Sequence, residues 1–331
     1  MKKILCRILS LTLCAAVLCA LPVSAAETEA AAPESSTAPA YPAPVQVCGK
    51  ITWQESGCFL LESGRKDDPY SEIIVHLSEN TPIVDAVSGL PLDAAAVKDG
   101  ETVCAWVGPA MTMSLPPQAS AAAAAAHIPA DGAAPQYYEV TGLDQTVAIA
   151  IYPAPPRTEV NLPVASGGTL RIPVSAQISP WLTKNIVTLD DLTPGSRILV
   201  WRDANGEVSR VLLLPSQYRG WLSWDETGRG SINGTPLSTA GKVVDGEVLL
   251  PLREVAETLG LTVFWEKTSG ANVCTPEGLL LAVMPGRGSA EVGAAGNFEE
   301  LLGPCVLEKG VTYLCAEDLA RLLDLYPAPR A

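Results

Sequence analysis

The chain has 331 residues, of which 48% are hydrophobic, and its 36 acidic and 22 basic side chains give a formal net charge of −14. So acidic a surface repels nucleic-acid phosphates and anionic wall polymers. Nucleic-acid binding is therefore excluded.

Residues 1–25 have the pattern of an export signal. Three basic residues among the first seven precede the apolar run Ile8–Leu21, and a small-residue site ends at Ala25. This pattern predicts cleavage before Ala26. The apolar run is too short for a membrane span, and no later segment approaches that length. We expect an exported protein, secreted or associated with the cell wall. Its net charge is −17 once the three basic residues of the signal are removed.

The segment 26–45 consists mostly of Ala, Pro, Glu, Ser and Thr and predicts a disordered linker. From Val47 to about Pro215 the chain is predicted to be all-β. Two strand patterns there echo each other, because Gly100 precedes Trp106 and Gly195 precedes Trp201 by the same interval. We interpret residues 46–118 and 119–215 as two small β-barrel or sandwich modules, OB-like in size and turn spacing.

Between these two similar strand patterns, the sequence does not decide the secondary structure of every segment. The run Ala119–Ala126 is compatible with a short helix or a disordered loop. Tyr137–Val140 and Thr146–Ile151 are rich in aromatic or β-branched residues and predict strands.

The stretch Ser231–Gly260 predicts strands and tight turns that lead into one helix. Asn233-Gly234 and Asp245-Gly246 are turn pairs. Pro251 suits the first turn of a helix, and Gly260 suits its end. One apolar helix face is formed by Leu252, Val255, Ala256 and Leu259.

The same order recurs downstream. The segment Cys305–Leu307, the turn Glu308–Gly310 and the segment Val311–Leu314 precede a helical pattern over Ala316–Leu323. Two such strand–turn–strand–helix units indicate an internal duplication.

The segment Leu249–Glu266, LLPLREVAETLGLTVFWE, closely resembles the copper amine oxidase N-terminal-like domain. That family has a VPLR…AE.LG..V.W pattern after an Asn-Gly hairpin, repeated once in weaker form. The resemblance covers about 230–325 and is weaker in the second unit. The family's structural pattern falls here on Asn233, Gly234, Pro251, Leu252, Arg253, Glu257, Leu259, Gly260 and Trp265.

The resemblance implies a non-catalytic stalk domain, typical of secreted or envelope proteins of Gram-positive, notably clostridial, bacteria. A copper amine oxidase needs three His ligands and a quinone-forming Tyr in an Asn-Tyr context. This chain has two His, His76 and His127, and no Asn-Tyr pair. We therefore expect no oxidase activity, no metal and no cofactor.

Six cysteines remain after the signal: Cys48, Cys58, Cys104, Cys274, Cys305 and Cys315. An even number in an exported chain permits disulfides, for which Cys48 with Cys58 and Cys305 with Cys315 are near in sequence. The strand-like surroundings of Cys104 and Cys274 favour buried free thiols instead.

No pattern of a catalytic site stands out. Neither His lies in a nucleophile or metalloprotease motif. Asp67-Asp68, Asp190-Asp191, Glu254 with Glu257, and Glu299-Glu300 are paired carboxylates, but a glycosidase needs two at a set distance across a cleft. We interpret these pairs as turn or solvated residues.

The tryptophans are a better indication of binding. Trp106, Trp201 and Trp265 lie in apolar strand patterns and are predicted core residues. Trp221 and Trp224, near Tyr218 and Arg219, are candidates for packing between domains or for contact with a carbohydrate or peptide.

The sequence thus predicts a mainly β protein with tandem β-barrel or OB-like modules and a smaller α+β C-terminal domain, which contains the duplicated β-β-α units. The predicted order is signal 1–25, linker 26–45, modules 46–118 and 119–215, connector 216–229 and stalk-like domain 230–326. The expected function is non-catalytic binding of cell-wall polysaccharide or an envelope protein. The alternative is a wall-polymer hydrolase that uses acidic residues.

Overall fold

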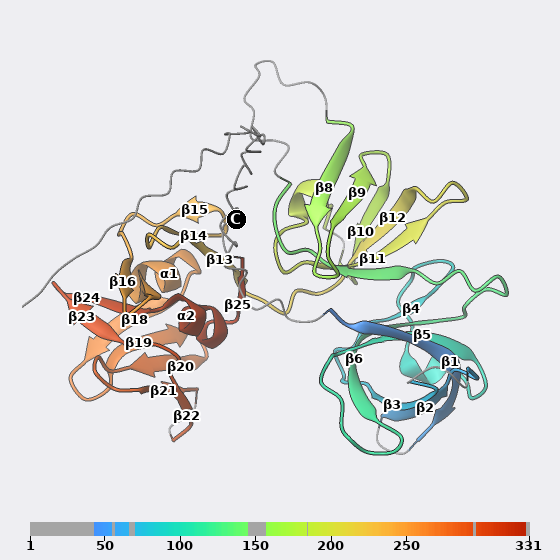
Figure 1. Cartoon of the computed structure of the whole chain (residues 1–331), viewed down its shortest axis with the longest axis horizontal. Helices are drawn as coiled ribbons and strands as arrows, with labels where there is room; N and C mark the ends of the chain where they lie inside the picture. The colour runs from blue at the N-terminus through green and yellow to red at the C-terminus, as the bar shows by residue number, and fades with distance from the viewer. Residues whose placement is uncertain are drawn as a thin grey trace, which may run out of the picture. The chain divides into compact units, whose positions relative to one another are not determined.

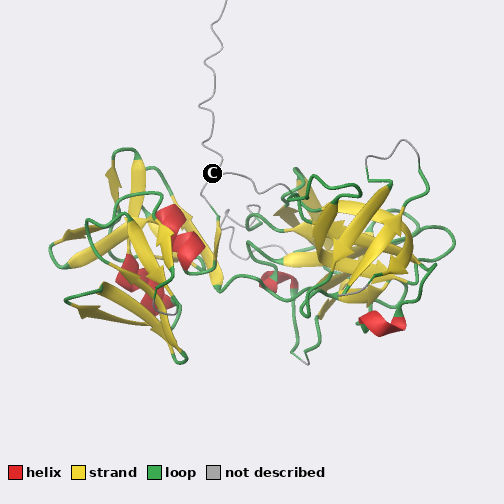
Figure 2. Ribbon diagram, turned by 90° about the horizontal axis from the view of Figure 1, so that it is seen from below, coloured by secondary structure: helices red, strands yellow, loops and turns green. Residues whose placement is uncertain are grey.

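The computed structural model describes residues 43–54, 57–65, 70–144, 157–183, 185–293 and 296–328. Its fold is mainly β, as predicted (Figure 2). The described part contains two α-helices. The signal at 1–25, nearly all of the linker, the turn pair at 67–68 and the strand expected at 146–151 lie outside the described residues.

The strands between Val45 and Ala126 form a closed β-barrel, which is called the first module from here on. Its strands are β1 (Val45–Trp53), β2 (Cys58–Glu62), β3 (Glu72–His76), β4 (Ile83–Asp85), β5 (Thr102–Val107) and β6 (Gln118–Ala126), with a 3-10 turn at Ala94–Ala96. They form one sheet in the order β3-β2-β1-β5-β6-β4. A parallel pairing of β3 with β6 joins the two sides of this sheet. The strands β1, β2, β3, β5 and β6 thus close into a five-stranded barrel, and β4 pairs with β6 beside it. Of the two predicted architectures, barrel or sandwich, this module has the barrel.

Strand β6 contradicts both interpretations of the alanine run, which is neither a helix nor a loop. It pairs with β5, β3 and β4, and its last four alanines are buried. Alanine favours a helix in isolation, but pairing on both edges and burial override that preference. Small side chains also let other groups pack closely against this strand.

The second module combines a four-stranded sheet with a hairpin. Its strands are β7 (Gln136–Glu139), β8 (Glu159–Pro163), β9 (Thr169–Pro173), β10 (Gln177–Pro180), β11 (Arg197–Arg202) and β12 (Val208–Leu213), with a 3-10 turn at Leu189–Asp191. The sheet order is β10-β12-β11-β7, and β8 pairs with β9. Gly100 and Gly195 have φ values of 81° and 84° before β5 and β11, so both predicted turns are confirmed.

Contacts of Trp201 and Arg210 join the turn after β4 to the second module. The indole N–H of Trp201 donates to the Ala86 carbonyl at 2.6 Å. The Arg210 guanidinium stacks 4.0 Å from the Trp201 ring centroid and donates to the carbonyls of Val87 and Ser88. Trp201, a predicted core residue, is thus half-buried in a polar and aromatic contact, whereas Trp106 is fully buried as predicted.

The C-terminal domain, residues 220–328, is shown in orange and red in Figure 1, and its core contains side chains from three sheets and two helices. Its strands are β13 (Gly220–Trp224), β14 (Gly230–Ile232), β15 (Thr235–Pro236), β16 (Lys242–Val244), β17 (Glu247–Pro251), β18 (Thr262–Glu266), β19 (Gly270–Thr275), β20 (Gly278–Val283), β21 (Ser289–Val292), β22 (Phe298–Glu300), β23 (Val306–Glu308), β24 (Val311–Cys315) and β25 (Leu325–Pro327). Its helices are α1 (Leu252–Thr258) and α2 (Ala316–Leu322).

This domain contains the predicted duplication. The first unit is β16-β17-α1 and the second is β23-β24-α2. They meet in one sheet of order β16-β17-β24-β23, in which β17 and β24 pair antiparallel. The five strands β18 to β22 are inserted between the units as a separate sheet. Asp245-Gly246 and Lys309-Gly310 turn the two hairpins with positive φ at both residues, which is the backbone that primed turns require.

In each unit, a carboxylate on the helix holds the loop that lies 15 to 16 residues before it. In the first unit, Glu254 accepts hydrogen bonds from the amides of Ser238 and Thr239, which lie 16 and 15 residues earlier. In the second unit, Asp318 accepts from Leu302 and Gly303 at the same separations, 16 and 15 residues. Such matched contacts are what a duplicated unit retains when its sequence diverges.

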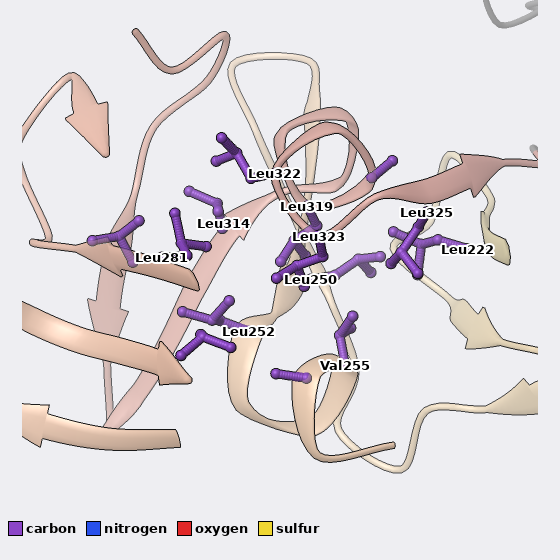
Figure 3. Close-up of a cluster of buried hydrophobic side chains, with 14 of the residues drawn as sticks. Leu222, Leu250, Leu252, Val255, Leu281, Leu314, Leu319, Leu322, Leu323 and Leu325 are labelled. Carbon is purple, nitrogen blue, oxygen red and sulfur yellow. The ribbon is translucent and has the colours of Figure 1, made fainter. Parts of the chain in front are cut away.

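The two helices bury their apolar faces in one core (Figure 3). Leu252 and Val255 of α1 and Leu319 of α2 are fully buried, and they pack with Leu281 of the inserted sheet. Each buried leucine contributes about 1.5–3 kcal/mol. This shared core fixes α1 beside β18, where the groove described next is found.

Candidate functional site

A groove of about 730 Å³ opens beside α1. It is lined by residues of α1, of β18 and of the β23–β24 hairpin, together with the loop at Ser238 and Thr239. Small-molecule and peptide side-chain pockets commonly have volumes of 300–1,000 Å³, so the groove is large enough for a ligand.

Two aromatic side chains lie exposed along this groove. Phe264 is 46% exposed and Trp265 is 48% exposed. The prediction that Trp265 belongs to the core is therefore wrong. The reason is the position of β18, which is the edge strand of the inserted sheet and pairs only with β19 in the described structure. Val263, two residues earlier, is the side chain that enters the core.

The charged side chains that line the groove are bonded to neighbouring groups of the protein. Arg253 donates to the Val263 carbonyl at 2.7 Å and to Glu257 at 3.0 Å. Burial opposes the ionisation of Glu254, but hydrogen bonds from Ser238 and Thr239 outweigh it and hold the carboxyl pKa below its ordinary value. Glu254 and Glu257 therefore both have hydrogen-bond partners within the protein.

The family-pattern residues form turns, caps and core contacts. Asn233-Gly234 forms the predicted hairpin turn with φ values of 50° and 79°. Pro251 ends β17 immediately before α1, and Leu252 is fully buried. Leu259 is the C-cap residue of α1, and Gly260 follows it with a φ of 77°.

The four aromatic and basic residues proposed near the connector lie on and just before β13, which pairs with β14 and β25. Trp221 and Trp224 are half-buried, and the Trp221 amide donates to the Asn233 side chain at 2.9 Å. The Tyr218 ring contacts that of Tyr326 edge-on at 5.2 Å, and the Arg219 amide donates to Asp324. The structure thus places this group apart from the residues that line the groove.

The histidines lie in the first module. His76 hydrogen-bonds Gln118 at 2.8 Å, and the Nδ1 atom of His127 lies 2.7 Å from Asp85. Asp85 also accepts the backbone N–H of Ser88, which is the main cause that lowers its pKa to about 2.

The remaining carboxylate pairs also have structural partners. Asp190 pairs with Arg157, Asp191 accepts hydrogen bonds from the backbone N–H and the hydroxyl of Thr188, and Glu299 pairs with Arg321. Among the described residues, no group of three or more His, Cys, Asp or Glu side chains could hold a metal ion.

The cysteines differ from the favoured prediction of buried free thiols at three positions, because Cys48 and Cys104 are bonded and Cys274 is a free thiol that is only partly buried. Cys48 and Cys104 face each other on β1 and β5 and form a disulfide. Adjacent strands bring together residues that are far apart in sequence, which spacing alone does not reveal. Cys305 and Cys315 are thiols, and burial raises their pKa values to about 12 and about 11.

Comparison with known families supports the resemblance of the C-terminal part. Residues 231–325 match the family model for the copper amine oxidase N-terminal domain. The match covers the duplicated units, the inserted sheet and the groove, and it concerns the non-catalytic part of such oxidases. A search of curated proteins found no match. Among the described residues, no helix has the length and apolarity needed to cross a membrane.

Proposed function

We propose that this is an exported, non-catalytic binding protein of the cell envelope, and that the groove beside α1 is its ligand site. The observation that carries the proposal is the pair of half-exposed rings, Phe264 and Trp265, on an edge strand beside a hollow of about 730 Å³. Exposed aromatic side chains dominate the energetics of binding surfaces.

The polar groups of the groove support binding over hydrolysis. A general acid or base must reach substrate, whereas Glu254 is held by two backbone amides and Glu257 by Arg253. The alternative function, a hydrolase that uses acidic residues, therefore has less support at this site.

Export is proposed from residues 1–25, whose basic start, apolar run and small-residue site fit a cleaved signal. The test is expression of the full chain in a Gram-positive host, followed by N-terminal sequencing of the protein in the medium and in the wall fraction. A mature chain that begins at Ala26 supports export. Retention of the intact chain inside the cell contradicts it.

The binding role is tested by co-sedimentation of the chain from residue 26 with a Gram-positive envelope fraction that retains wall polymers and wall-associated proteins. Phe264→Ala with Trp265→Ala is expected to reduce the bound fraction at least fivefold. Phe298→Ala removes an exposed ring from the opposite edge of the same sheet and is the matched control. Unchanged binding by the double variant, or release of soluble wall fragments, would overturn the proposal.

A further inference from the structure

We infer that the occupant of the groove is an extended, net-basic polypeptide segment that adds as a strand to the free edge of β18. This inference rests on the proposed function and specifies the ligand class. It depends on three features of the domain: the backbone of the edge, the exposed rings and the charge.

The backbone of β18 is partly available on the side away from β19, where Arg253 already binds one carbonyl, that of Val263. Because the Val263 carbonyl accepts from Arg253, the backbone groups of Val263 point away from β19. Alternation along a strand then directs the N–H and C=O of Trp265 to the same side. In the described structure, no other segment pairs with this edge. A row of alternating backbone donors and acceptors is matched best by another extended backbone.

The opposite edge of the same sheet shows how an edge is normally protected. Strand β22 contains Glu299 and Glu300, and Arg321 binds the Glu299 carboxylate and the Glu300 carbonyl. Charged side chains of this kind discourage pairing with another chain. Strand β18 instead exposes Phe264 and Trp265, with a charge only at its last residue. Arg253 covers one carbonyl of β18, as Arg321 covers one of β22, but β18 lacks the pair of adjacent charged residues that protects β22.

Charge favours a basic partner over a second copy. Residues 231–325 contain 13 acidic and 6 basic side chains. Two copies of this domain repel each other, whereas a positively charged segment is attracted. The hollow beside the edge is lined by apolar groups such as Leu307 and Val311, which suit the alternate apolar side chains of a bound strand.

A neutral sugar is a poorer fit to this groove. Sugar recognition needs side-chain groups that can bond hydroxyls, but Arg253, Glu254 and Glu257 are bonded within the protein. Along this side of β18, the backbone groups without a partner in the described structure are the N–H of Val263 and the N–H and C=O of Trp265.

The probe is a blocked seven-residue peptide that alternates lysine with valine and has one central phenylalanine, titrated into the chain from residue 26 by calorimetry. Two N-methylated versions of this peptide are compared. In each version the amide N–H groups along one edge of the extended peptide are methylated, and the two versions differ in which edge is blocked. We expect the parent peptide to bind, and one of the two methylated versions to bind at least tenfold more weakly than the other. Equal binding by both methylated peptides would overturn strand addition but leave the groove as the ligand site.

Variants of the protein show at which edge of the sheet the peptide binds. Trp265→Ala is expected to weaken binding at least tenfold, whereas Phe298→Ala leaves it unchanged, and circular dichroism verifies that both variants are folded. A peptide with glutamate in place of lysine should bind at least tenfold more weakly at low salt.

Three results would overturn the inference: equal binding of the glutamate peptide, binding of chitin oligosaccharides but not of the parent peptide, and a concentration-dependent dimer abolished by Trp265→Ala. The sugar result would leave the proposed function standing. Loss of envelope binding with retained peptide binding would contradict only the proposed envelope role.

Discussion

The two β-β-α units share a scaffold but differ in what lies beside each helix. Glu254 and Asp318 occupy equivalent positions, 64 residues apart, and each holds a loop through two backbone amides. Asp318 is completely buried and also binds Arg321, whereas Glu254 is only partly covered and lines the groove. The second unit has become a closed structural element, and the first has retained an open surface that is free for binding.

The largest expected difference concerns these two carboxylates. Asp318→Ala should lower the free energy of unfolding by about 3–4 kcal/mol, because it removes a completely buried carboxylate that binds two backbone amides and Arg321. Glu254→Ala should cost about 1 kcal/mol, because water can reach the amides of Ser238 and Thr239. Urea denaturation of both variants measures the difference. Equal losses would contradict the contrast between a closed and an open unit.

A smaller difference is expected between the two arginines. Arg321→Ala removes contacts to Asp318, Glu299 and the Glu300 carbonyl, and should cost about 1–2 kcal/mol. Arg253→Ala removes an exposed ion pair and one bond to a carbonyl, and should cost about 0.5 kcal/mol. The same denaturation experiment checks both values, and a larger cost for Arg253→Ala would contradict the account.

The first unit should also show a pH dependence that can be traced to Glu254. Its folded-state pKa lies below the ordinary value of 4.5, so its stabilising effect is present above about pH 4.5 and is lost as the pH falls through the folded-state pKa. The stability difference between wild type and Glu254→Gln should therefore be full at pH 6 and shrink below about pH 4. Denaturation curves across this range test the sign, and a difference that grows on acidification would contradict it.

The smallest expected effect on stability comes from the groove rings. Phe264→Ala and Trp265→Ala should each cost less than about 1 kcal/mol, because both side chains are half exposed. Thermal denaturation measures this cost. A loss of several kcal/mol would indicate that the rings serve packing, and that the groove is a structural feature.

Local patterns made much of the C-terminal fold predictable. Asn233-Gly234 and Asp245-Gly246 require positive φ, and the apolar spacing of α1 permits one buried face, so turns and helix could be derived residue by residue. The duplication was visible for the same reason. The matched roles of Glu254 and Asp318 were not predicted, since they depend on loops 15 and 16 residues away.

Features set by tertiary pairing were harder to predict. The alanines of β6 favour a helix in isolation and become a strand only because three neighbouring strands pair with them. Trp265 has a core-like sequence context, yet its strand lies at a sheet edge. Alternation places Phe264 on the face opposite to the core residue Val263, so its exposure could be predicted. It places Trp265 on the same face as Val263 and gave no sign that Trp265 is exposed. The partner of Cys48 likewise depends on the register of β1 with β5.

The most direct test of the binding surface is hydrogen–deuterium exchange of the chain from residue 26, with and without the saturating lysine–valine peptide, analysed by mass spectrometry. The account predicts that peptide slows exchange of the amides of β18, Thr262–Glu266, and leaves β22, Phe298–Glu300, unchanged. Protection at β22, or no change at β18 under saturation, would contradict the claim that β18, beside helix α1 of the first unit, is the binding edge.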